Sequence, residues 1–161
     1  MRGTTVAEPG SGGEADALVL GGRDGPGAVT AADCALVLIS APGAVALVHA
    51  GWQGAARGLL EAALGVLARR GAPAQAWLGP CLGPTSFEVG PEVADLFPRR
   101  FHAETSWGTR SVDLPGFLCD RLAAAGVDAA WCGIDTFTDP AFFSHRRGDL
   151  WRHALVAEVE E

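Results

Sequence analysis

The chain has 161 residues, a formal net charge of −7 and 48% hydrophobic residues. Such a length and apolar content predict a single globular domain over residues 1–161. The acidic balance argues against nucleic acid or an anionic membrane as the main partner, since both attract basic surfaces. We expect a cytoplasmic protein that binds a small ligand, because the sequence shows neither a signal-peptide pattern nor a long apolar run.

Residue usage narrows the possible chemistry further. All 12 basic residues are arginines, which excludes Schiff-base chemistry on lysine and leaves anion binding to arginine, backbone N–H groups or helix termini. The four cysteines are widely spaced, without a Cys-x-x-Cys pair, and predict neither a local zinc finger nor a disulfide framework. The four scattered histidines make a multicopper oxidase the least favoured metalloenzyme, so copper is less favoured than zinc.

The first clear element along the chain is a β-hairpin. Two apolar, β-branched-rich runs at residues 31–39 and 44–52 flank the dipeptide Pro42-Gly43. This dipeptide favours a turn, because proline presets φ and glycine accepts a positive φ. Two shorter strand-like pieces are expected before the hairpin, at residues 4–7 and 15–20.

The hairpin brings together a thiol and an imidazole. A turn centred on Ala41-Pro42 pairs Cys34 with His49, whereas one centred on Pro42-Gly43 pairs Cys34 with Gly51. Either register puts Cys34 and His49 on one face of the sheet, because strand side chains alternate with period two. The pair could be two zinc ligands, or a nucleophile with its base. Alternatively, Cys34 is a small buried hydrophobe and His49 an ordinary strand-end residue.

A helix is expected after His49, with leucines at helical spacing from residue 59 and an end at Gly71. Its glycine-flanked start at Gly54 would offer free N–H groups and the positive end of the helix dipole to an anion. An ordinary strand-to-helix turn is the alternative. Beyond it we expect strands at 74–78, 85–89, 129–134 and 154–159, a short helix at 91–97, and a helix that Asp113 caps and Gly126 ends.

A polar block near the C-terminus is the second candidate site. It runs from Ser144 to Asp149 and contains the adjacent pair Arg146 and Arg147. Two guanidinium groups could hold a phosphate or carboxylate, because each binds oxyanions through paired N–H groups. The alternative is a solvated turn, since exposed charges are common.

Together these motifs resemble the laccase-domain family, also called the YfiH-like family. The resemblance extends over most of the chain and rests on several motifs in the right order. It implies an α+β fold of mixed β-sheets layered between helices. It also implies phosphorolysis of purine nucleosides, with adenosine deamination as a companion activity, and a zinc ion held by two histidines and one cysteine. The matching motifs are residues 32–34, 48–52, 78–84 with 87–90, 113–114, and 139–140 leading into 143–147.

By this resemblance Cys34 is the cysteine ligand and His49 the second histidine ligand. The family's first histidine aligns with Arg2, which cannot bind a metal, and the family's N-terminal segment has no counterpart before it. Two further departures are Gln53, where relatives usually carry a basic residue, and Asp135, where many carry cysteine. Two protein ligands should bind zinc more weakly than the usual three.

The leading hypothesis is a zinc-dependent purine nucleoside phosphorylase that converts adenosine, inosine or guanosine and phosphate to the free base and ribose 1-phosphate. Cys34 and His49 would hold the metal and act in catalysis. Phosphate would bind near Arg146, Arg147 and Gly54, with Asp33 as an orienting residue. The alternatives are a metal-free Cys-His hydrolase with Cys34 as nucleophile, and an inactive, divergent member. The oligomeric state is left open.

Overall fold

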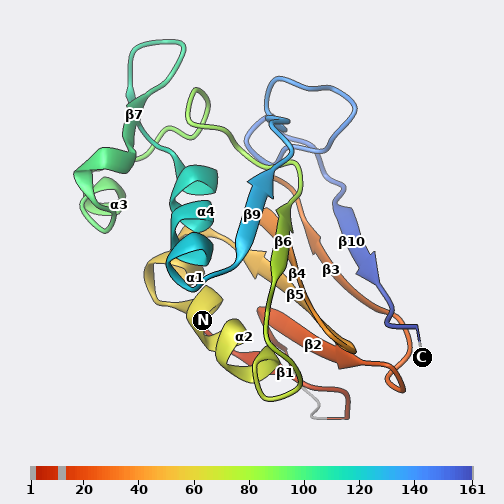
Figure 1. Ribbon diagram of the computed structural model, residues 1–161. Coiled ribbons are helices and arrows are strands. Elements are labelled where there is room, and N and C mark those ends of the chain that lie inside the picture. Colours follow the sequence, from red (N-terminus) through yellow and green to blue (C-terminus); the bar gives the residue numbers. More distant parts are fainter. Residues whose placement is uncertain (1–2, 11–13, 161) are drawn as a thin grey trace.

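A computed structural model describes residues 3–10 and 14–160 and has the expected α+β fold (Figure 1). Its centre is a mixed six-stranded sheet in the order β1-β2-β5-β4-β6-β9. β1 and β9 lie parallel to their neighbours β2 and β6, and the other pairs are antiparallel. The strands are β1 (Val6–Ala7), β2 (Ala17–Gly21), β4 (Ala35–Ala41), β5 (Ala44–Ala50), β6 (Gln75–Leu78) and β9 (Asp128–Trp131).

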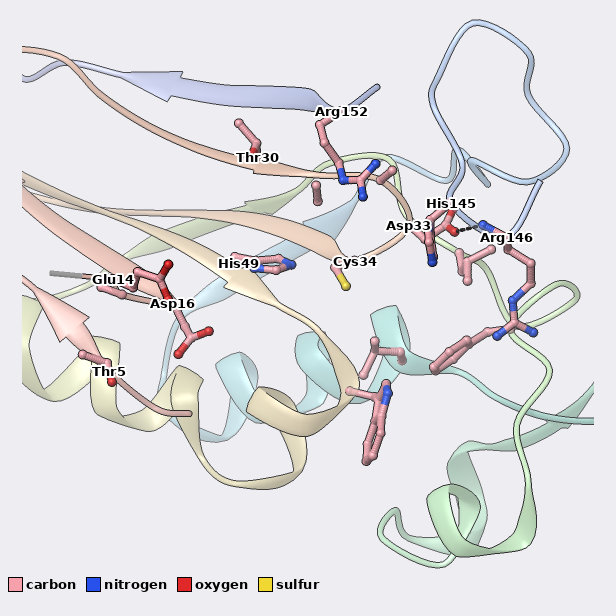
Figure 2. Close-up of a pocket in the computed structure, with 17 residues that line it drawn as sticks. Thr5, Glu14, Asp16, Thr30, Asp33, Cys34, His49, His145, Arg146 and Arg152 are labelled. Atoms are coloured by element: carbon pink, nitrogen blue, oxygen red, sulfur yellow. Dashed lines mark hydrogen bonds between the residues drawn. The ribbon is translucent and has the colours of Figure 1, made fainter. Parts of the chain in front are cut away.

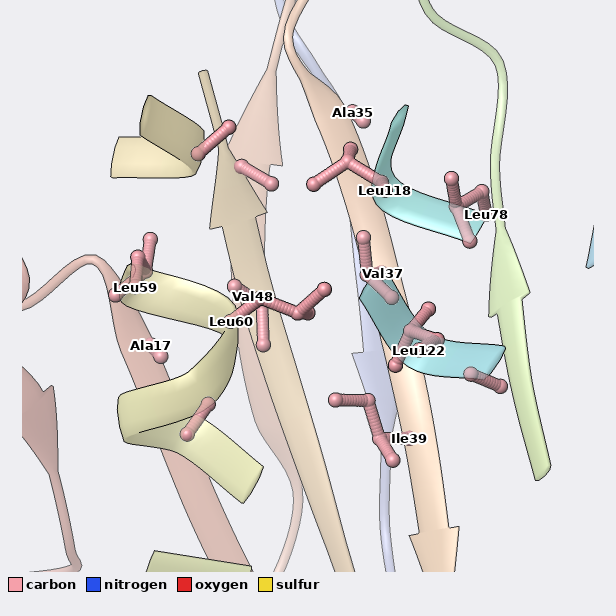
Figure 3. Packing of buried hydrophobic residues seen from close by; sticks show 14 of the residues in the cluster. Ala17, Ala35, Val37, Ile39, Val48, Leu59, Leu60, Leu78, Leu118 and Leu122 are labelled. Atoms are coloured by element: carbon pink, nitrogen blue, oxygen red, sulfur yellow. The ribbon is translucent and has the colours of Figure 1, made fainter. Parts of the chain in front are cut away.

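Two helices, α2 (Leu59–Leu67) and α4 (Leu114–Ala124), cover one face of this sheet (Figure 3). Val37 and Val48 point from paired positions of β4 and β5 into the layer that the helices fill, and both are fully buried. Leu60 and Leu122 are the corresponding buried side chains from the helices. Burying each such side chain stabilises the fold by about 1.5–3 kcal/mol.

A two-stranded antiparallel sheet of β3 (Gly27–Ala31) and β10 (His153–Ala157) covers the opposite face. Glycine at position 27 lets β3 approach β2 without displacing the side chain of Leu18, since a Cβ there would lie 2.6 Å from a methyl carbon of that residue. His153 pairs with Ala31 in this small sheet. The molecule is therefore layered as helices, large sheet and small sheet.

The hairpin prediction is confirmed, and the structure selects one of its two registers. Ala35 pairs with Ala50, so the turn centres on Pro42-Gly43, and Gly43 adopts a φ of 71°. The expected first strand at 31–39 is wrong as one continuous element. Residues 32–34 break it, because Asp33 turns the chain with a φ of 85°, and β3 thereby leaves for the other sheet.

The helix expected to start after Gly54 consists of two helices. α1 (Trp52–Ala56) begins earlier, and Gly58, with a φ of 83°, separates it from α2. The predicted caps of α4 are confirmed: the Asp113 carboxylate accepts a hydrogen bond from the Gly116 N–H at 2.9 Å, and Gly126 adopts a φ of 78°. None of the helices in the described part of the chain is long and apolar enough to cross a membrane.

The segment between β6 and α4 differs from the expectation. Residues 85–89 form a turn with an isolated bridge between Glu88 and Ser111, because Phe87 N–H bonds back to Gly83 O instead of entering a sheet ladder. Phe97 and Phe101 both pack edge-on against Phe117 of α4, which fixes this segment on the helix layer. Its elements are α3 (Pro91–Ala94), a 3-10 turn η1 (Arg99–Phe101), and the strand pair β7 (His102–Glu104) and β8 (Arg110–Val112).

Candidate functional site

A cavity of about 790 Å³ lies where the small sheet meets the ends of β4 and β5 (Figure 2). Its size suits a small-molecule ligand, for which cavities of roughly 300–1,000 Å³ are typical. Cys34 and His49 line it together, and Trp52 of α1 adds an aromatic wall. The structure therefore brings the thiol and the imidazole of the hairpin to one site.

Gly51 makes room for the Cys34 thiol. A Cβ at position 51 would lie 3.1 Å from Cys34 Sγ, so a side chain there would press on the sulfur. His49 is fixed through its backbone, whose N–H donates to Asp16 O at 2.8 Å. Cys34, His49 and Asp16 also line a smaller cavity of about 220 Å³. Local backbone contacts thus hold both candidate catalytic residues in place.

Asp33 links the start of β4 to the C-terminal polar block. Its carboxylate is buried and accepts two hydrogen bonds, from Thr136 Oγ1 at 2.7 Å and from the backbone N–H of Arg146 at 2.8 Å. Its own carbonyl accepts from Leu82 N–H at 2.9 Å. Asp33 therefore joins three distant segments directly beside Cys34. The orienting role expected for Asp33 stays a prediction.

Arg146 lines the cavity, as does its neighbour His145. The Arg146 guanidinium donates to Glu88 O at 2.8 Å and lies 5.9 Å from the centre of the Phe87 ring. Among residues 3–10 and 14–160 it has no carboxylate partner. Arg146 therefore keeps its positive charge uncompensated at the cavity wall.

Arg147 is used differently. Its guanidinium donates to the carbonyls of Thr136 and Phe142, at 2.8 and 2.5 Å, and pairs with the Asp149 carboxylate at 2.5 Å. The Ser144 backbone N–H and the Arg147 guanidinium lower the pKa of Asp149. Arg147 does not appear among the residues around the described cavity. The geometry gives it a loop-holding role, and its expected role in phosphate binding stays a prediction.

Gly54 is buried inside α1 instead of standing at the helix start, so the expected helix start is wrong. A Cβ there would lie 2.9 Å from a methyl carbon of Leu59, which explains the glycine by close packing of α1 on α2. Gly54 lines the smaller cavity but not the larger one. This packing is reason enough for a glycine at position 54, and the expected role of Gly54 in phosphate binding stays a prediction.

The sequence of this chain is similar to those of known proteins. A family described as multi-copper polyphenol oxidoreductase laccase matches residues 2–157. The chain belongs to this laccase-domain family. A relative from Pseudomonas aeruginosa, named purine nucleoside phosphorylase, is 44% identical over 64% of this chain and 46% of its own length. Another of that name, from Xylella fastidiosa, is 37% identical over 88% of this chain and 58% of its own length. The chain thus spans about half the length of these relatives.

Solved structures support the laccase-domain fold. A Neisseria meningitidis protein superposes with a TM-score of 0.85 and 30% identity, covering 100% of this chain and 73% of its own. A Bacillus licheniformis protein called YfiH gives a TM-score of 0.85 at 21% identity, covering 99% of this chain and 72% of its own. The latter similarity concerns the fold alone.

The zinc expected for a laccase-domain protein can be tested against the donor set. Cys34 and His49 offer a thiolate and an imidazole, but a catalytic zinc ordinarily has three protein ligands. Within the described residues no group of three or more His, Cys, Asp or Glu side chains is placed to hold a metal ion. Arg2, where the family's first histidine aligns, lies outside those residues. The described residues therefore do not fit a three-ligand zinc site.

Three charged residues of the cavity had no signal in the sequence. Glu14, Asp16 and Arg152 line it beside Cys34 and His49, although none belongs to a motif that we singled out. Glu14 and Asp16 precede β2, and Arg152 directly precedes β10. Only the packing of the small sheet against β2, β4 and β5 brings them together.

Proposed function

We propose that this protein cleaves purine nucleosides with inorganic phosphate and releases the free base and ribose 1-phosphate. The observation that supports this proposal most is one cavity lined by Cys34, His49, Arg146 and Arg152, in a chain whose relatives carry the name purine nucleoside phosphorylase. Phosphate and a nucleoside together match a cavity of about 790 Å³ with polar and aromatic walls.

In the proposed reaction a phosphate oxygen attacks the anomeric carbon of the ribose as the bond from that carbon to the purine nitrogen breaks. The electron pair of this bond leaves with the purine, which takes up a proton. His49, which lines the cavity, is our candidate for carrying that proton. Arg146 and Arg152, the two arginines of the cavity, are the candidates for binding the phosphate.

Zinc and adenosine deamination are finer parts of the proposal. Cys34 and His49 would be two of the zinc ligands, and a third would have to come from outside the described residues. Deamination would use the same cavity: water would add at C6 of the purine of adenosine, ammonia would leave, and inosine would be the product.

The test measures, by chromatography, how much free base the protein releases from adenosine, inosine and guanosine. Each reaction is run with and without phosphate. We expect phosphate-dependent release of base with ribose 1-phosphate as the second product. His49→Asn should lower the rate at least about 100-fold, in line with the loss of a general acid, and Cys34→Ser should also lower it, because it removes a proposed zinc ligand. Cys132→Ser, at an exposed cysteine, is the matched control. Folded wild-type protein that releases no base with phosphate and zinc would contradict the proposal.

A second candidate function remains, since among the described residues no third His, Cys, Asp or Glu side chain is placed to hold a metal ion together with Cys34 and His49. In a metal-free hydrolase Cys34 would be the nucleophile and His49 its base. Chelator-treated protein would then be active without phosphate and would lose that activity on alkylation by iodoacetamide. Activity unaffected by alkylation would exclude this candidate. Absence of both activities would favour the inactive, divergent member.

A further inference from the structure

The cavity carries opposite charges in different places (Figure 2). The carboxylates of Glu14 and Asp16 lie on one side of His49, beside Thr5. Arg152 reaches from the start of β10 toward Cys34, on the other side. A phosphate dianion is repelled by carboxylates and attracted by guanidinium. The Asp33 carboxylate also lies on the side of Cys34, but its oxygens already accept from Thr136 Oγ1 and the Arg146 N–H. The charge distribution therefore points to the side of Cys34 and Arg152 as the anion side.

The three arginines of this region differ in how much of their hydrogen-bonding capacity is already used. Arg147 is engaged by several loop carbonyls and by Asp149. Arg146 donates to Glu88 O, and its guanidinium lies near Phe87, away from Cys34 (Figure 2). Within the described part of the chain, Arg152 donates only to the carbonyls of Leu150 and Trp151, its own neighbours, at 3.4 and 3.1 Å.

Arg152 also has no carboxylate partner within residues 3–10 and 14–160. A planar guanidinium with free N–H groups binds phosphate through two parallel hydrogen bonds. We infer that Arg152, and not Arg146 or Arg147, is the main phosphate-binding residue of the cavity. This inference rests on the proposed function for its substrate, and it assigns a binding role to a residue outside every sequence motif.

The carboxylates of Glu14 and Asp16 indicate where the nucleoside would bind relative to the phosphate. Phosphate at Arg152 leaves the side of Glu14 and Asp16 to the nucleoside. Carboxylate oxygens accept hydrogen bonds from sugar hydroxyls, and the indole of Trp52 offers an apolar surface to a purine ring. The anomeric carbon would then lie between the two sides, near Cys34 and His49.

The experiment compares Arg152→Gln with Arg69→Gln, which removes the same charge from an exposed position at the end of α2. We expect Arg152→Gln to raise the KM for phosphate at least about tenfold, the usual cost of losing a charge-assisted hydrogen bond, with the KM for inosine changed less than about twofold. Arg152→Lys should raise the KM for phosphate less than Arg152→Gln does, because lysine keeps the positive charge although it lacks the paired N–H groups of a guanidinium. Arg146→Gln should change the KM for phosphate less than Arg152→Gln does.

Calorimetric titration with inorganic phosphate alone separates this inference from the proposed function. Phosphate binding by wild type and Arg69→Gln, but at least about tenfold weaker binding by Arg152→Gln, supports the inference even without nucleoside cleavage. Phosphate-dependent turnover with equal phosphate KM and Kd in Arg152→Gln and Arg69→Gln would overturn the inference and leave the proposed function standing. Wild type that neither binds phosphate nor uses it would overturn both.

Discussion

At the scale of single residues, Asp33 does more than its position beside Cys34 suggested. It is the one non-glycine residue with a positive φ in the described part of the chain, at 85°. Aspartate tolerates this conformation better than most residues. Its buried carboxylate accepts from Thr136 and Arg146, so the unusual backbone and the two hydrogen bonds support each other. Asp33 thereby fixes the cavity wall next to Cys34.

The variant Asp33→Asn tests this role. Asparagine also tolerates a positive φ, but its NH2 group would face a donor where one carboxylate oxygen now accepts. We expect the free energy of unfolding to fall by about 1–3 kcal/mol, measured by urea denaturation, and kcat to fall with it. Asp95→Asn, at an exposed aspartate, is the control. Unchanged stability and kcat would show that Asp33 does not organise the wall.

Cys34 and His49 give a second prediction, on metal content. Because the described residues supply only two ligands, zinc-loaded protein should retain less than one zinc per chain after gel filtration. Cys34→Ser and His49→Asn should each reduce the retained zinc further, as measured by elemental analysis. Full zinc retention by His49→Asn would mean that the metal binds elsewhere.

At the scale of elements, the C-terminal loop and β10 act as one wall of the cavity. Arg147 holds the loop through backbone carbonyls, Asp33 anchors it to β4, and β10 joins it to β3. His153 begins β10 and packs edge-on against Phe142, with ring centres 5.8 Å apart. Burial lowers the pKa of His153, against smaller opposing effects of the Pro80 backbone and the Asp33 carboxylate.

This shift predicts how stability depends on pH. Because the pKa of His153 is lower in the folded state than its unfolded value of about 6.5, the folded state binds fewer protons. Its contribution to stability is therefore present above that pH and is lost as the pH falls toward the folded pKa. Urea denaturation between about pH 7.5 and 5.5 should show a smaller loss of stability for His153→Gln than for wild type. His145→Gln is the control for removing a histidine, and equal slopes for wild type and His153→Gln would contradict the prediction.

At the scale of the whole molecule, the cavity depends on all the layers. Its charged residues come from the segment before β2, the turn between β3 and β4, the loop between β9 and β10, and the residue directly before β10. Cys34 and His49 lie at the end of the large sheet where β4 begins and β5 ends. Arg152, directly before β10 of the small sheet, points toward them. A ligand in this cavity therefore contacts parts of the chain that only the folded state brings together.

Ligand binding should consequently stabilise the whole fold. Phosphate with a poorly reacting nucleoside analogue, at about 100 times their dissociation constants, should add about 2.7 kcal/mol for each independently bound ligand. This gain corresponds to a rise of roughly 5–10 °C in Tm for a domain of this size. Thermal unfolding with each ligand alone and with both measures the effect. Absence of any shift at saturation, alongside a normal shift in a known phosphorylase, would contradict binding at this cavity.

The sequence by itself determined the local structure and the reactive pair. The Pro42-Gly43 turn, the caps Asp113 and Gly126, and the common face of Cys34 and His49 follow from backbone preferences and strand alternation, which act over a few residues. Only the tertiary structure decided the hairpin register, the break at residues 32–34 and the partners of Asp33. It also placed Arg152 in the cavity and turned the Arg147 guanidinium toward carbonyls of its own loop. The bonds of Asp33 join residues 103 and 113 positions apart, and Arg152 is as far from Cys34 and His49 in the chain, so their meeting depends on layer packing and leaves no periodic pattern.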